Sequence, residues 1–145
     1  MEKTCVAFLM DDEKEALEHI KYQRPEIIKD YGDKAYGRLM YQGDDGWRKL
    51  CRCTKCGGLY ILQYAEEHFM SRDDEWFYDY YPVSSQSEAE NICKENDGNR
   101  LAGYFHDRYL RAFYENVPFW RLGYKLPKEE KETIKTKYNC HFTFD

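Results

Sequence analysis

The sequence predicts an α+β fold in which a central antiparallel sheet, a meander around residues 47–83, carries helices packed on it. Three segments rich in aromatic and β-branched residues follow one another there, joined by short turns, which is typical of a meander. Charged segments with apolar residues at helical spacing lie on both sides of this region. With 145 residues the chain has the size of one domain with one core, so we predict a single domain over residues 1–145.

The N-terminal part is expected to be helical. Residues 5–10 form a short apolar run that suits a strand or the lead-in to a helix. Residues 11–22 predict an amphipathic helix, because apolar side chains recur on one face and the first turn is acidic. A second helix is predicted over residues 25–40, where the apolar residues also have helical spacing and two glycines weaken the pattern. The cluster QGDDGW then predicts a turn.

The three predicted strands begin at Trp47. The segment WRKLCRC leads into a turn with two glycines, LYILQYAEEHF leaves that turn, and EWFYDYYPV follows the polar turn SRDD. Pro82 marks the end of the third strand or an edge position, because proline cannot donate a ladder hydrogen bond.

A capped helix is predicted after the meander. Ser85 and Glu88 have the S-x-x-E spacing of a capping box, and apolar residues on one face follow, so we expect a helix over residues 86–96.

The C-terminal third is predicted to start with another helix over residues 102–115. Phe105, Tyr109 and Phe113 are four positions apart and would line one helical face. After Pro118 we expect a loop or short strand. A charged helix in the segment LPKEEKETIKTKY and an edge strand in the tail CHFTF would complete the chain.

Composition limits the classes of partner. Aromatic residues make up 17% of the chain and 14 of its residues are tyrosines, which excludes ordinary disorder. The net charge of −5 argues against nucleic acid as a partner and favours a basic protein. No apolar run reaches the length of a membrane span, so we expect no membrane contact. The start of the sequence lacks an apolar signal-peptide core, so we expect the six cysteines to be reduced thiols in the cytoplasm.

The segment CRCTKCGG carries the clearest chemical motif. Cys53 and Cys56 have the spacing of one zinc knuckle. Structural zinc takes four ligands, and we expect Cys51 as a third thiol and His68 as the fourth ligand. None of the remaining cysteines and histidines forms a second close pair with ligand spacing. Two interpretations stay open: a structural zinc, or no cofactor, with the glycines providing the tight turn.

No catalytic signature accompanies the motif, so the sequence predicts a protein that is not an enzyme. The histidines are scattered, whereas a nucleophilic cysteine needs a base beside it. An acidic and aromatic segment is instead typical of a protein-binding face, where Trp and Tyr act as anchors and carboxylates select a basic partner. The predicted contact residues are Asp73, Asp74, Glu75, Trp76, Tyr78 and Asp79.

The stretch WRKLCRCTKCGGLYILQY, an acidic turn, YYPV and the capped SEAE helix together resemble small bacterial immunity proteins encoded beside polymorphic or contact-dependent toxins. The resemblance covers roughly residues 47–92, and its matching motif positions are Cys53 and Cys56. It implies a compact cytoplasmic α+β domain that binds and neutralises a cognate toxin domain. The acidic charge suggests a basic toxin of the nuclease type. The alternative is a zinc-binding regulatory or adaptor domain that contacts nucleic acid or a transcription component.

Overall fold

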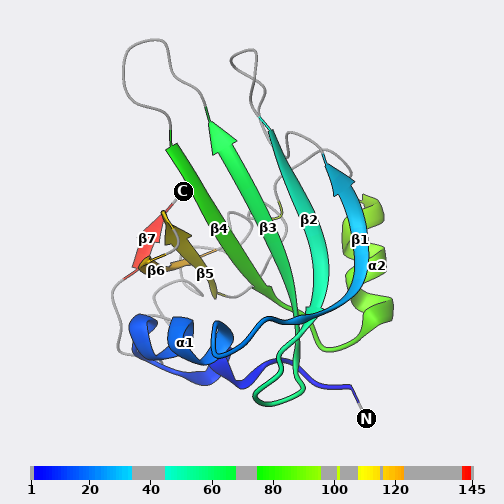
Figure 1. Cartoon of the computed structure of the whole chain (residues 1–145), viewed down its shortest axis with the longest axis horizontal. Coiled ribbons are helices and arrows are strands. Elements are labelled where there is room, and N and C mark those ends of the chain that lie inside the picture. The colour runs from blue at the N-terminus through cyan, green and yellow to red at the C-terminus, as the bar shows by residue number, and fades with distance from the viewer. Residues whose placement is uncertain are drawn as a thin grey trace.

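In the part of the chain that the structure describes, the fold is a seven-stranded sheet flanked by two α-helices (Figure 1). The computed structural model describes residues 2–33, 45–67, 75–95, 101, 108–114, 116–122 and 142–144. Its elements are η1 (Val6–Leu9), α1 (Glu13–Ile20), β1 (Glu26–Asp33), β2 (Asp45–Arg52), β3 (Leu59–Glu67), β4 (Glu75–Pro82), α2 (Gln86–Glu95), β5 (Arg108–Phe113), β6 (Val117–Leu122) and β7 (Phe142–Phe144).

The strands lie in sequence order from β1 to β7. Every neighbouring pair from β1 to β6 is antiparallel, and only β7 runs parallel to β6. The predicted α+β class with a central antiparallel meander is therefore confirmed, and the meander is longer than the three predicted strands. No helix among the described residues is long and apolar enough to cross a membrane.

Each face of the sheet packs its own core, because successive side chains of a strand point to opposite faces. The first core joins sheet residues to η1 and α1: Phe8, Ala16, Leu17, Ile20, Cys51, Tyr60, Tyr80, Leu110 and Trp120. The second joins sheet residues to α2: Leu50, Ile61, Tyr81, Ala89, Ile92 and Tyr109. The two helices therefore cover different parts of the sheet, as Figure 1 shows, with α2 beside β1.

Each helix begins at a side-chain cap, and the sequence predicts the one at Ser85. The Asp12 carboxylate accepts hydrogen bonds from the backbone N–H groups of Lys14 (2.8 Å) and Glu15 (3.0 Å), which fixes the start of α1. At α2, the backbone N–H of Glu88 donates to Ser85 Oγ at 3.0 Å. The Glu88 carboxylate binds the preceding Ser84 hydroxyl at 2.6 Å, so the reciprocal half of the capping box is shifted by one residue.

The helix predicted over residues 25–40 is wrong where the structure describes it, because residues 26–33 form the edge strand β1. Backbone pairing with β2 outweighs the helical spacing of the apolar residues. Gly32 has φ +96°, which an α-helix does not accommodate. Residues 34–40 lie outside the described residues.

The helix predicted over residues 102–115 is also wrong where it is described. Residues 108–113 form β5, which pairs with β4 on one side and β6 on the other. The first five residues of β5 are all buried, so burial does not alternate along this strand as it does along a strand with one exposed face. Residues 102–107 and the predicted charged helix lie outside the described residues. The segment after the fifth strand forms β6, and the tail forms the edge strand β7, as expected.

A buried ion pair joins β4 to β5. Arg111 Nε donates to Asp79 Oδ1 at 2.7 Å, and its Nη2 donates to Oδ2 at 2.9 Å. The hydroxyl of Tyr81 donates to the same carboxylate at 3.0 Å. Asp79 is fully buried. The structure therefore corrects the expectation that Asp79 contacts a partner, because its carboxylate is committed to the interior.

Candidate metal centre

Four side chains from three separate parts of the chain converge at one end of the sheet. Cys5 precedes η1, His19 lies in the last turn of α1, and Cys53 and Cys56 belong to the turn between β2 and β3. Their ligand atoms all lie within 4.8 Å of one another. Three of the four residues are buried and Cys56 is partly buried. Three thiols and one imidazole are a common donor set for structural zinc.

The turn between β2 and β3 presents two of these donors. Gly57 N–H donates to the carbonyl of Cys53 at 2.8 Å, and Cys53 N–H donates to the carbonyl of Gly58 at 2.8 Å. Gly57 has φ +77°, a conformation that favours glycine. Gly58 N–H points at Cys56 Sγ from 3.4 Å. The backbone therefore holds both thiols on the inside of a closed turn.

The third thiol, that of Cys5, lies on the N-terminal segment, which pairs in parallel with the start of β3. Leu59 N–H donates to the carbonyl of Lys3 at 2.7 Å, and Cys5 N–H donates to the carbonyl of Leu59 at 3.1 Å. This pairing brings Cys5 Sγ to 3.7 Å from Cys56 Sγ. Gly58 lies directly under the segment: a Cβ added there would be 2.3 Å from Cys5 Cα and 2.4 Å from Cys5 N.

We therefore expect Gly58→Ala to displace Cys5 from the cluster and to weaken zinc binding by about 10- to 100-fold, the size of effect seen when a supporting group is lost. The control is Gly32→Ala, which is strained by its φ of +96° but meets no atom within 4 Å and lies away from the thiols. Competition titration with a zinc chelator would measure both affinities. Equal affinities in the two variants would contradict the packing role of Gly58.

Side chains of β5 and β6 bind the backbone that connects η1 to α1, which lies between the candidate ligands Cys5 and His19. Arg108 Nη2 donates to the carbonyl of Phe8 at 3.0 Å and also to that of Met10. Trp120 Nε1 donates to the carbonyl of Asp11 at 2.9 Å. The Arg108 guanidinium lies 3.7 Å from the centre of the Trp120 ring. These contacts anchor the backbone between Cys5 and His19 to the sheet.

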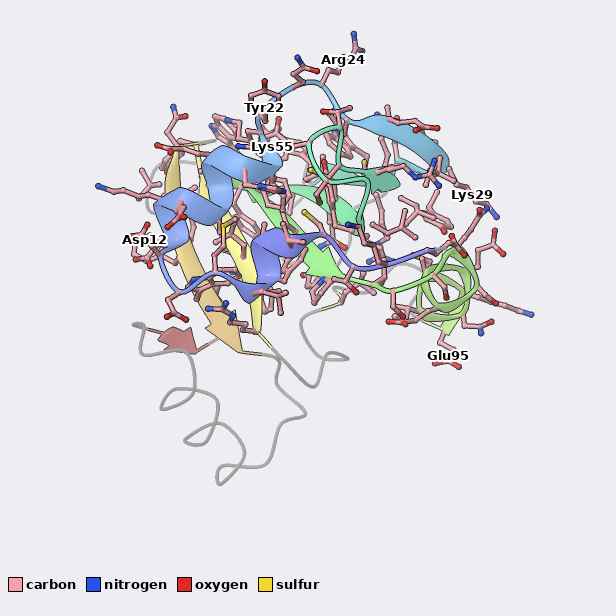
Figure 2. All side chains as sticks on the ribbon, turned by 90° about the horizontal axis from the view of Figure 1, so that it is seen from below. Asp12, Tyr22, Arg24, Lys29, Lys55 and Glu95 are labelled. Carbon is pink, nitrogen blue, oxygen red and sulfur yellow. The ribbon has the colours of Figure 1, made fainter. Side chains whose placement is uncertain are left out.

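The segment that follows α1 also contacts the knuckle, which is the turn between β2 and β3 that carries Cys53 and Cys56. Lys55 Nζ lies 4.9 Å from the centre of the Tyr22 ring, and Figure 2 shows the two side chains next to each other above α1. Because Tyr22 follows the last turn of α1, this contact lies where the end of that helix meets the β2–β3 turn.

The surroundings shift the pKa values of the Cys5 and Cys56 thiols in opposite directions. Burial raises the pKa of Cys5, and the neighbouring thiols of Cys53 and Cys56 raise it further. Burial alone would also raise the pKa of Cys56, but hydrogen bonds from the N–H groups of Val6 and Gly58 and the nearby imidazole of His19 outweigh it and lower the pKa to about 6. Among the described residues, His19 Nε2 is buried without a hydrogen bond of ordinary geometry. A metal ion would satisfy that nitrogen and the thiolates together.

No family model, curated protein or solved structure matches this chain. The donor set is therefore assigned from geometry. Cys53 and Cys56 are predicted ligands that the structure brings together. The prediction that Cys51 is a ligand is wrong, because Cys51 is not part of the cluster. It lies within β2, roughly 6–7 Å before Cys53 along the extended strand, and packs in the core. His68 lies outside the described residues.

Cys5 and His19 complete the cluster, and neither has metal-ligand spacing to another donor along the chain. Cys5 and Cys56 are 51 positions apart. His19 is next to Ile20 on the buried side of α1, where a histidine is as compatible with simple packing as with metal binding. The sequence signal for His19 was limited to the amphipathic helix predicted over residues 11–22, in whose last turn it lies.

A surface of aromatic rings lies on the sheet face that α1 partly covers. We call Trp47, Tyr64, Trp76, Tyr78 and Tyr114 the aromatic ribbon. Successive ring centres are 5.4–5.9 Å apart from Trp47 through Tyr64, Tyr78 and Trp76 to Tyr114. The first four residues are half-buried and Tyr114 is exposed.

Only some of the predicted contact residues belong to this surface. Trp76 and Tyr78 belong to the aromatic ribbon. Glu75 is the first residue of β4, next to them in the sequence. Asp79 points to the opposite face and is buried, and residues 73–74 lie outside the described residues.

A groove of about 530 Å³ adjoins the aromatic ribbon. Its floor is formed by sheet side chains, and one wall is formed by the last residue of α1, Ile20, and by residues between 21 and 25. The floor residues are Trp47, Tyr60, Leu62, Tyr78 and Tyr80. Trp47 and Tyr78 belong to both features, so the aromatic ribbon and the groove form one continuous surface.

Proposed function

We propose that the protein binds one structural zinc ion through Cys5, His19, Cys53 and Cys56, and that it acts by binding another protein. The observation that carries the zinc assignment is the closed set of four donors within 4.8 Å. Four protein ligands fill a tetrahedral zinc and leave no position for a water or substrate, which is the arrangement of a structural rather than a catalytic site.

Zinc in this site would join the N-terminal segment, the end of α1 and the β2–β3 turn. These parts are distant in the sequence, so the complete site exists only in the folded chain and the free energy of zinc binding becomes free energy of folding. The N–H groups aimed at Cys56 would hold its thiolate in the orientation that the metal requires.

The metal content provides a direct test. We expect elemental mass spectrometry of the protein, purified without chelators, to give one zinc per chain. Removing the zinc with a strong chelator should lower the midpoint of thermal unfolding, and adding zinc should restore it. A protein that refolds in excess zinc with less than about 0.1 zinc per chain, and whose unfolding midpoint ignores both treatments, would contradict the assignment.

For the biological role, we propose neutralisation of a basic toxin domain, as in the immunity proteins that residues 47–92 resemble. The acidic net charge and the half-buried Trp and Tyr rings of the aromatic ribbon support binding to a basic protein. The test is co-expression with a basic toxin domain encoded beside this chain. Cells should survive with the wild-type protein, and the two proteins should co-purify as a complex.

One observation favours a zinc-containing adaptor for nucleic acid as a second candidate. Lys21 and Arg24 line the groove, and Lys55 lies in the neighbouring knuckle, so cations lie close to aromatic rings. Binding of a single-stranded oligonucleotide that weakens steeply with salt, without binding of the toxin, would favour this role.

A further inference from the structure

We propose that Cys5 and Cys56 form a redox pair: an oxidant of the peroxide class joins their sulfurs in a disulfide, and the zinc ion is released. The inference rests on the proposed zinc site and specifies how the occupancy of that site is regulated.

The two sulfurs are already in contact. Cys5 Sγ lies 3.7 Å from Cys56 Sγ, and a disulfide bond is about 2.05 Å long. The backbones that carry the two side chains are close as well, because a Cβ added to Gly58, two residues after Cys56, would be 2.3 Å from Cys5 Cα. We therefore expect rotation of the two side chains to be enough for the bond to form.

The direction of the Cys56 side chain selects Cys5 over Cys53 as its partner. The backbone N–H of Val6 donates to Cys56 Sγ, and the N–H of Gly58 lies 3.4 Å from the same atom, so the sulfur is held against the N-terminal segment. Cys5 directly precedes Val6 in that segment. Among the described residues, a hydrogen bond between sulfurs joins Cys56 to Cys5 and none joins either of them to Cys53.

Exposure decides which thiol meets the oxidant first. Cys56 is only partly buried, whereas Cys5 and Cys53 are 1% and 2% exposed. Cysteines that respond reversibly to peroxide are typically accessible and lie beside a second thiol that reacts with the first product. Cys56 has this accessibility, and the buried Cys5 is in the position of the second thiol.

The reaction consumes one molecule of hydrogen peroxide for two thiolates. The Cys56 thiolate attacks a peroxide oxygen, so that an S–O bond forms, the O–O bond breaks and hydroxide leaves. The Cys5 thiolate then attacks the Cys56 sulfur, so that the S–S bond forms, the S–O bond breaks and a second hydroxide leaves. The two sulfurs lose two electrons in total, the two oxygens gain them, and solvent protonates both hydroxides to water.

Zinc release follows from the change in the donors. The thiolate is the form of cysteine that binds metal, so after oxidation only His19 and Cys53 remain of the four donors. Two donors do not fill a tetrahedral zinc site. The disulfide links residues 51 positions apart, which should stabilise the metal-free chain by closing a long loop. Oxidation therefore removes the metal link to α1 and leaves the N-terminal segment joined to the β2–β3 turn.

The test treats the zinc-loaded wild-type protein with hydrogen peroxide, blocks the free thiols and maps the disulfide after digestion with trypsin. Trypsin cleaves after Lys3 and Lys55, which places Cys5, Cys53 and Cys56 in three different peptides. We expect mass spectrometry to find the Cys5 peptide joined to the Cys56 peptide, and a zinc indicator to show about one zinc released per disulfide. Dithiothreitol with added zinc should restore the loaded protein.

Two metal-free variants separate the pair from the metal. Cys5→Ser and Cys53→Ser each remove one almost fully buried thiol of the same site, so the two changes are matched. Cys53→Ser keeps the redox pair, and peroxide should form its Cys5–Cys56 disulfide at a rate within about 3-fold of metal-free wild type. In Cys5→Ser, disulfide formation at Cys56 should be at least about 10-fold slower. Circular dichroism of each variant verifies that it is folded.

A Cys53–Cys56 disulfide in the wild type would overturn the inference and leave the zinc site standing. So would zinc release without any disulfide, or equal rates of disulfide formation at Cys56 in the two variants. A wild-type protein that never holds zinc but forms the Cys5–Cys56 disulfide would instead overturn the proposed zinc site, while the pairing of the two thiols would stand.

Discussion

Cys56→Ser is expected to abolish zinc binding and to lower the free energy of unfolding by about 4 kcal/mol when free zinc exceeds its dissociation constant by about 1,000-fold. Serine is a poor zinc ligand at neutral pH, and three remaining donors leave the tetrahedral site open. Cys56 is the least buried of the four ligands, so the loss of packing should be small. Denaturant unfolding with and without added zinc would measure the effect.

The matched control is Cys51→Ser, which makes the same chemical change two residues before Cys53. Cys51 is fully buried in the core and does not belong to the cluster. This variant should lose some stability because a hydroxyl is placed in an apolar site, but it should keep one zinc per chain. The zinc assignment would fail if Cys56→Ser kept its zinc, or if Cys51→Ser lost it.

With zinc chelated, the wild-type protein should become nearly as unstable as Cys56→Ser. The two proteins then lack the same metal and differ by one partly buried sulfur atom. A large difference between them under these conditions would mean that Cys56 stabilises the fold by packing rather than through the metal.

Arg111→Met is the second change with a large expected effect: a loss of about 3–5 kcal/mol in the free energy of unfolding. It leaves the fully buried Asp79 carboxylate without its bidentate partner. Only the hydrogen bond from the Tyr81 hydroxyl then remains of the three described to that carboxylate. Denaturant unfolding monitored by circular dichroism would give the free energy.

An exposed ion pair in the same protein provides the comparison. Lys29 Nζ lies 3.3 Å from Glu90 Oε1, and both side chains are nearly half exposed, at 48% and 43%. Glu90→Gln should cost less than about 1 kcal/mol, because solvent screens an exposed pair.

The double variant Asp79→Asn with Arg111→Met should recover much of the lost stability. The asparagine removes the unpaired charge and keeps an acceptor for Tyr81. If the double variant were as unstable as Arg111→Met, the loss would come from packing of the guanidinium, which lies 4.0 Å from the Phe77 ring centre, rather than from the buried charge.

Local chemistry was sufficient for several elements. Asp12 and Ser85 cap the two helices through contacts that span only three residues, so their positions follow from a short stretch of sequence. The meander likewise follows from apolar and aromatic strands separated by short turns. In contrast, β1 and β5 are stabilised by pairing with neighbouring strands of the sheet, whereas their apolar spacing alone suggested helices.

The sequence by itself determined half of the metal site, because Cys53, Cys56 and the following glycines act within one turn. Only the tertiary structure decided the other half. Cys5 reaches the knuckle through parallel pairing with Leu59, and His19 reaches it because β5 and β6 anchor the backbone that leads into α1. Metal ligands need proximity in space, and proximity between residues far apart in a chain is produced by strand pairing and core packing rather than by local spacing.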